Sequence, residues 1–100
     1  MNRVERHKEI CNQLNKIYET KNHDYGNSFG ETYEKLGIIS AITRISDKYN
    51  RICSLATKPA EERQVKDENI RDTLLDLANY CMMTIIEMDN EREREINNVI

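Results

Sequence analysis

Apolar residues recur at steps of three and four along most of this 100-residue chain, which is the repeat of one face of an α-helix. Only three Gly and one Pro interrupt that repeat, too few turn-forming residues for a many-stranded sandwich or barrel. The length suits one domain, residues 1–100, in which residues 89–100 form a charged tail that can fray. We therefore predict an all-α fold.

The repeat predicts three long helices, at residues 3–20, 38–56 and about 67–89, the last extending toward Glu95. In the second helix the predicted buried stripe has six members: Ile38, Ile42, Ile45, Tyr49, Ile52 and Ala56. The last helix carries two adjacent apolar stripes, one more than the other helices of this chain can cover. Because only 38% of the residues are apolar, we expect a homo-oligomer, at least a dimer.

A short loop helix is predicted between the first two long helices. Ser28 and Glu31 have the spacing of a capping box, and Gly37 is a stop signal. Before the last helix, residues 58–62 form a polar linker that holds the only Pro.

Charge and hydropathy argue against two kinds of partner, duplex DNA and a membrane. Residues 1–60 hold ten Lys and Arg against seven Asp and Glu, whereas residues 61–100 hold five against eleven. Neither part has the dense basic stripe of a duplex-DNA binder. No run approaches the roughly 20 apolar residues of a membrane span, and the N-terminus is charged, so we expect a cytoplasmic protein.

Three cysteines, Cys11, Cys53 and Cys81, form no CxxC pair and have no His at zinc spacing. Each lies among apolar positions, so we expect them to be small core residues.

Carboxylates recur on the polar face of the last helix, at Glu68, Asp72 and Asp76, and Asn79 continues the row. Side chains four residues apart stack on one face, so their oxygens can converge on one ligand. A solvated face explains Glu68, but a mid-helix Asp at position 76 needs a partner. That partner is either Mg²⁺ or an arginine.

Arg44, Lys48 and Arg51 lie on the polar face of the helix at residues 38–56. The two arginines either form a salt-bridge ladder with Asp72 and Asp76 or present guanidinium groups to phosphate oxygens in a cleft.

A polar stretch at residues 22–28 contains His23, Asp24, Tyr25 and Asn27 beside a glycine. Donors, acceptors and an aromatic ring close together can stack on and hydrogen-bond a nucleobase. The alternative is an ordinary loop with an Asx turn.

Two segments, KNHDYGNSFGETYEKLGIISAITRISDKYNR and VKDENIRDTLLDLANYCMMTIIEM, resemble the phage and bacterial family called nucleotide modification associated domain. That family is similar to the all-α MazG-like nucleoside triphosphate pyrophosphohydrolases. The resemblance covers roughly residues 15–88, and its most specific elements are the run 24–26, the basic helix and Asp72–Asp76 followed by Asn79 and Tyr80. It implies a MazG-like helical bundle completed by oligomerisation.

The chain departs from the MazG-like pattern in its acidic residues. Those enzymes hold Mg²⁺ with an ExxE on one helix and an ExxD on the next. Asp76 matches the final acid of the second motif, but Thr73 stands where its Glu belongs, and the first motif is missing. Losing half of a carboxylate cage while gaining cations favours binding of phosphates over hydrolysis.

We therefore expect a small phage-type, anti-defence protein that sequesters a nucleotide or a nucleotide-derived immune signal, linear or cyclic, in the cytoplasm of a bacterial host. We expect no catalytic residues and no required cofactor, and Mg²⁺ belongs to the first alternative below. The expected ligand-binding residues are His23, Asp24, Tyr25, Asn27, Arg44, Lys48, Arg51 and Asn79. The first alternative is a divergent MazG-like pyrophosphohydrolase with Mg²⁺ on Glu68, Asp72 and Asp76, and the second is a helical interaction module without a small ligand.

Overall fold

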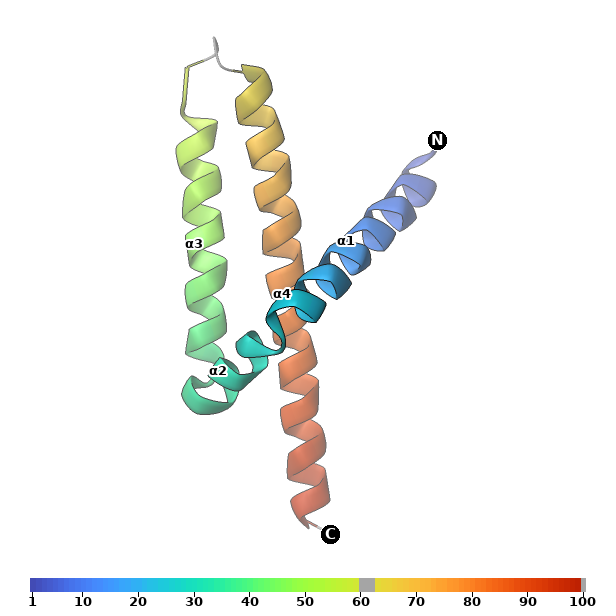
Figure 1. Ribbon diagram of the computed structural model, residues 1–100, viewed down its shortest axis with the longest axis vertical. Coiled ribbons are helices and arrows are strands. Elements are labelled where there is room, and N and C mark those ends of the chain that lie inside the picture. Colours follow the sequence, from blue (N-terminus) through green and yellow to red (C-terminus); the bar gives the residue numbers. More distant parts are fainter. Residues whose placement is uncertain (60–62, 100) are drawn as a thin grey trace.

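The computed structural model of the protein (Figure 1) describes residues 1–59 and 63–99, without the side chains at positions 25, 63–66 and 99. Within these residues it has no strand and four α-helices: α1 (Arg3–Tyr25), α2 (Ser28–Leu36), α3 (Ile38–Ala56) and α4 (Arg63–Val99). The all-α fold expected from the sequence is confirmed. The molecule measures 60 × 32 × 25 Å, because the 37 residues of α4 alone span about 55 Å.

The body of the fold is the antiparallel pair of α3 and the first half of α4 (Figure 1). Ala41 and Leu55 are buried on α3, and Thr73 and Thr84 are buried on α4. Each threonine hydroxyl donates a 2.7 Å hydrogen bond to the carbonyl one turn earlier, so neither is buried unpaired. Small buried side chains on both helices allow close packing of the pair.

Helix α1 crosses α4 and is attached to it over a short stretch (Figure 1). Leu14 is buried there, and the side-chain amide of Asn79 donates a 3.2 Å hydrogen bond to the Leu14 carbonyl. Residues 1–9 are exposed, and Val4 keeps 80% of its accessible surface, because the N-terminal end of α1 points away from the hairpin. The apolar repeat of α1 is therefore buried only toward its C-terminal half.

Two glycines with positive φ bracket α2. Gly26 (φ +68°) ends α1 and Gly37 (φ +74°) ends α2, in a backbone region that other residues rarely adopt. Between them Tyr33 is buried, and its hydroxyl donates a 3.2 Å hydrogen bond to Glu91 of α4. Burial, together with the carboxylates of Glu91 and Glu87, raises the pKa of Tyr33. This contact joins α2 to the second half of α4.

The predicted bounds of the helix at residues 38–56 are confirmed, and those of the other long helices are too short. The first helix continues through residues 21–25, beyond the predicted end at residue 20. The last begins at Arg63 and runs through the predicted frayed tail to Val99. In the predicted linker, residues 58 and 59 are non-helical, and residues 60–62 lie outside the described chain.

The capping box predicted at Ser28 and Glu31 is wrong. Asn27 is the residue that precedes α2, and no side-chain hydrogen bond caps this helix. The chain does contain a capping box at the start of α1, where Asn2 accepts from the backbone of Glu5 at 2.8 Å and Glu5 accepts in return.

The predicted buried stripe of α3 is exposed at four of its six positions. Ile38, Ile42 and Tyr49 are 42%, 47% and 60% exposed, whereas Ala41 and Leu55 are buried. Because successive helical residues are 100° apart, the buried face is rotated by about 75° from the predicted stripe. The repeat predicts the helix correctly, but the buried residues Ala41 and Leu55 each precede a stripe residue, Ile42 and Ala56, by one position.

The expectation that all three cysteines belong to the core is also wrong. Cys11, Cys53 and Cys81 are exposed. On their helices, Cys53 is turned about 160° from the buried Leu55 and Cys81 about 80° from the buried Thr73, so neither belongs to the buried face.

An outer apolar face remains on the α3–α4 hairpin, and we define it by Ile38, Ile42 and Tyr49 of α3 with Leu74, Ile85 and Met88 of α4, all exposed. On each helix these residues lie about 60–120° from the buried ones. Antiparallel helices turn in opposite senses, so the two sets share one side of the hairpin, opposite the side that carries α1. No described helix is long and apolar enough to cross a bilayer.

Candidate functional site

A cavity of about 320 Å³ lies where all four helices meet, close to the crossing of α1 and α4. Its size falls at the lower end of the range of small-molecule sites. The described residues that line it come from every helix: Tyr18, Lys21, Asn22, Gly26, Asn27, Ser28, Phe29, Thr32, Ser40, Arg44, Asp76, Asn79, Tyr80 and Met83. Positive, aromatic and amide groups therefore share one concave surface.

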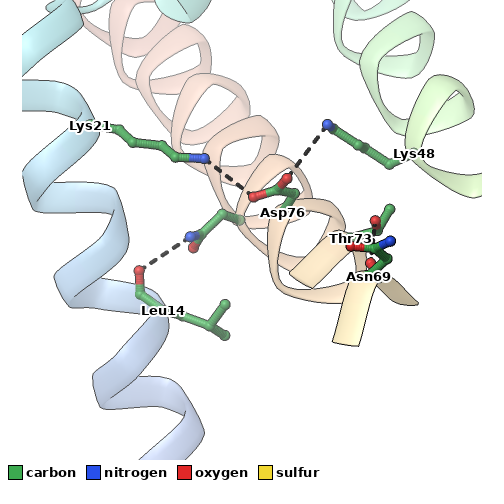
Figure 2. A network of polar contacts seen from close by, with 7 residues as sticks. Leu14, Lys21, Lys48, Asn69, Thr73 and Asp76 are labelled. Atoms are coloured by element: carbon green, nitrogen blue, oxygen red, sulfur yellow. Dashed lines mark hydrogen bonds and ion pairs between the residues drawn. The ribbon is translucent and has the colours of Figure 1, made fainter. Parts of the chain in front are cut away.

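Asp76 is the centre of the charged part of the cavity. Its carboxylate accepts from Nζ of Lys21 at 3.2 Å and pairs with Nζ of Lys48 at 3.5 Å. Figure 2 shows the two lysines reaching the carboxylate from opposite sides, Lys21 from α1 and Lys48 from α3. Asp76 and Lys48 are each about 30% exposed, so the cluster is partly withdrawn from water. One carboxylate thus joins three helices.

Helical spacing explains how these groups come together. Tyr18 and Lys21 are three residues apart on α1, and Arg44 and Lys48 are four apart on α3, so each pair shares a helix face. Asp76 lies on α4 between the two faces, and Arg44 lines the same cavity. The charged groups of the site are therefore three cations and one anion.

Aromatic rings form a second part of the lining. Phe29 of α2 and Tyr80 of α4 have ring centroids 5.8 Å apart with planes tilted by 33°, and Tyr18 of α1 also lines the cavity. Aromatic faces stack on nucleobases with little sequence preference. Rings of this kind can stack on one flat heteroaromatic group.

The neutral polar groups differ in their availability. Ser40 already donates a 2.8 Å hydrogen bond to the Gly37 carbonyl, and the Asn79 amide is bonded to α1. The side chains of Asn22 and Asn27 are exposed and line the cavity, and each offers both a donor and an acceptor.

The structure gathers some of the expected ligand-binding residues and separates others. Asn27, Arg44 and Asn79 line the cavity, and Lys48 reaches it through Asp76. Arg51 is exposed on α3 and does not belong to the lining.

Two other expected residues of the polar stretch, His23 and Asp24, lie outside the lining. The side chain of Tyr25 lies outside the described part of the structure. His23 and Asp24 are exposed, 3.3 Å apart, and pair with each other on the outside of α1.

The expected metal ligands do not converge. Glu68 and Asp72 are exposed on α4, and the Asp76 carboxylate is paired with lysines. Among the described side chains, no group of three His, Cys, Asp or Glu residues could hold a metal ion. The alternative ladder to Arg44 and Arg51 is wrong, because lysines occupy the positions next to Asp76.

Sequence reasoning missed Lys21, Tyr18, Phe29 and Tyr80. The predicted first helix ends at residue 20, one residue before Lys21, whereas α1 runs to Tyr25. Extending the helical repeat by one turn would have placed Lys21 on the face of Tyr18. No local signal indicates its pairing with Asp76, 55 residues away.

A protein family matches this part of the chain. Residues 21–88 fit the family described as nucleotide modification associated domain 1. The match spans more than half of the chain and includes all of α2 and α3 and every α4 residue that lines the cavity. No curated protein and no solved structure shows significant similarity to the chain.

Proposed function

Since the chain belongs to the nucleotide modification associated domain 1 family, we propose that it binds a nucleotide, without rapid hydrolysis, in the cavity where its four helices meet. The main support for this proposal is that cations and aromatic rings line the same cavity. Lys21 and Arg44 suit phosphate oxygens, and Phe29 and Tyr80 suit a base.

The acidic content of the site favours binding over metal-dependent hydrolysis. Asp76 is the one carboxylate among the described residues of the lining, and it is paired with two lysines. In-line attack on a phosphate with metal ions calls for several carboxylates held around them. The divergent pyrophosphohydrolase is therefore the second candidate.

A titration of the purified protein with nucleotides, followed by calorimetry, tests the proposal. We expect Arg44→Ala to weaken binding about tenfold or more, because hydrogen bonds to a charged partner contribute about 1.5–3 kcal/mol. Arg51→Ala is the matched control, since it removes an arginine of the same helix from outside the lining and should leave affinity unchanged. If no nucleotide binds the folded protein, the proposal fails and the helical interaction module gains support.

Release of pyrophosphate from nucleoside triphosphates, with Mg²⁺ or Mn²⁺ present, separates the two candidates. We expect turnover below about 0.1 s⁻¹, far under the roughly 10 s⁻¹ median of enzymes. Faster turnover that disappears in Asp76→Asn would establish the hydrolase instead.

The role we propose for such binding is sequestration of a nucleotide or nucleotide-derived immune signal, in a phage protein acting in the cytoplasm of its bacterial host. A protein that binds without turnover lowers the free concentration of its ligand. Stoichiometric protein should therefore protect a labelled nucleotide from added phosphatase, and denaturation should return it intact. Recovery of a cleaved product would contradict this role.

We also propose that the partner of the outer apolar face is a second copy of this chain. The accessible surface is 8011 Å², whereas a compact monomer of 11.8 kDa exposes about 5,900 Å². The radius of gyration of 16.5 Å likewise exceeds the roughly 13 Å of a compact 100-residue domain. An excess near 2,000 Å² is ample for a homodimer interface, which covers about 800 Å² or more on each partner.

Analytical ultracentrifugation at micromolar concentration should show a dimer or larger species and no folded monomer. Ile85→Glu, on the outer apolar face, should dissociate it, whereas Val4→Glu, at the far end of α1, should not. Dissociation by Val4→Glu alone would place the interface on α1.

A further inference from the structure

The Asp76 carboxylate lies between two ammonium groups that could bind an anionic ligand. Asp76 is the single acidic side chain in the described lining, and its carboxylate lies between Nζ of Lys21 and Nζ of Lys48. Both lysines reach it from other helices and neither is paired with a second carboxylate among the described residues. Asp76 therefore occupies the place that an anionic ligand would take between these two ammonium groups.

The charge of the site limits the charge of that ligand. Lys21 and Arg44 of the lining supply two positive charges, and Lys48, which lies outside the lining but pairs with Asp76, supplies a third. Asp76 supplies one negative charge, which leaves two positive charges of this cluster uncompensated. A phosphate monoester carries about −1.5 to −2 near neutral pH. A cyclic phosphodiester carries one charge fewer, and each further phosphate of a di- or triphosphate adds negative charge that the described lining does not match.

The volume of the cavity independently limits the ligand to about the size of one nucleoside with one phosphate. A volume of about 320 Å³ is close to the minimum for ligand pockets, roughly 300 Å³. The lining offers one aromatic platform, at Phe29 and Tyr80, and one group of cations. One base, one sugar and one phosphate use all of these features.

We propose, on the basis of the nucleotide-binding function above, that the ligand is a linear nucleoside monophosphate. Its dianionic phosphate replaces the Asp76 carboxylate as the ion-pair partner of Lys21 and Lys48. The phosphate also pairs with Arg44. Asp76 is a specificity-determining residue: it keeps the lysines in place in the empty cavity and competes with any phosphate that enters. This competition disfavours ligands with a single charge, which gain too little from the lysines to displace the carboxylate.

The first test compares ligands that share a base and differ only in phosphate. Adenosine, AMP, cyclic AMP, ADP and ATP are titrated into the wild-type protein by calorimetry in EDTA at constant ionic strength, and the series is repeated for the other bases. We expect the monophosphate of the preferred base to bind about tenfold tighter than its nucleoside, its cyclic form and its triphosphate. Equal or tighter binding of the triphosphate or the cyclic form overturns the inference but leaves nucleotide binding standing. Absence of binding by the entire set refutes the proposed function itself.

The second test uses charge variants. Asp76→Asn removes the competing carboxylate, so monophosphate affinity should rise and the preference for monophosphate over diphosphate should shrink by about tenfold. Lys21→Gln should weaken monophosphate binding, whereas Lys16→Gln, which makes the same change in net charge on an exposed position of α1 outside the lining, should not. Weaker monophosphate binding by a folded Asp76→Asn protein would show that the carboxylate supports binding instead of competing with the phosphate, and would overturn the displacement.

A measurement on the wild type keeps the inference testable if the variants do not fold. The ³¹P resonance of bound monophosphate should titrate at lower pH than that of the free nucleotide, because three cations favour the dianion. A bound resonance that titrates at the same pH as the free one would refute the placement of the phosphate among the lysines and Arg44.

Discussion

Replacing Gly30 by Ala should destabilise the protein, against the usual preference of helices. Gly30 is the third residue of α2 and is buried. A Cβ added there would lie 2.6 Å from Oε1 of Glu87, 2.6 Å from Nδ2 of Asn27 and 2.7 Å from Oδ1 of Asn27. Such separations are far shorter than ordinary van der Waals contacts, so both side chains must move. Glu87 is itself buried, 6% exposed, and has little room to do so.

The sign of the effect follows from two opposing magnitudes. Ala is favoured over Gly within a helix by about 0.5–1 kcal/mol. Overpacking of a filled site costs about 1–3 kcal/mol. The net loss should therefore lie between about 0 and 2.5 kcal/mol, and in a domain of this size each kcal/mol lowers Tm by about 4–8 °C.

Thermal and urea unfolding, followed by circular dichroism at one fixed protein concentration, measures this loss. In a Glu87→Ala background one of the two obstructing side chains is gone, and Gly30→Ala should then cost less; the difference is the coupling between the two positions. A stabilised Gly30→Ala protein would refute the packing described for α2 and α4. Because Asn27 also lines the cavity, Gly30→Ala should weaken nucleotide binding as well.

Three further outcomes are expected. Above about pH 10 the unfolded chain loses the Tyr33 proton while the folded chain, with its raised pKa, keeps it, so stability should fall with rising pH in the wild type and less steeply in Tyr33→Phe; equal slopes in urea unfolding would contradict this. Nucleotide affinity should be the same in EDTA as in Mg²⁺, and a marked loss in EDTA would bring a metal ion into the site. Cys11, exposed on α1, should react with a thiol reagent in the native protein, whereas Cys53 and Cys81, one turn from Tyr49 and Ile85 of the outer apolar face, should be protected in the dimer, and equal reactivity of all three would contradict an interface on that face.

Local sequence signals predict the helices well. The bounds of α3 follow from Gly37 before it and from Pro59 shortly after it, and residues between them keep the helical repeat without a break. The same signals do not predict which face of α3 contacts α4. Ile42 and Ala41 are neighbours, and only the packing of α4 decides that the small Ala41 is buried and the larger Ile42 exposed.

The candidate site was predictable to the extent that its residues share a helix. Arg44 and Lys48 stand out together on one face, and Asp76 stands out as a mid-helix carboxylate in need of a partner. The identity of that partner depends on how α1 crosses α4, which no local pattern indicates. The role of Lys21 therefore follows only from the packing of α1 against α4, which brings it to Asp76.

The way α1 is attached has a consequence for the motions of the protein. Leu14, its bond to Asn79 and the Lys21–Asp76 pair hold its C-terminal half, and residues 1–9 are exposed. Local opening of α1 should consequently need much less free energy than opening of the α3–α4 hairpin, and its amides should exchange fastest. Since the C-terminal half of α1 is also one wall of the cavity, a ligand held between α1 and α3 would slow exchange most in that half.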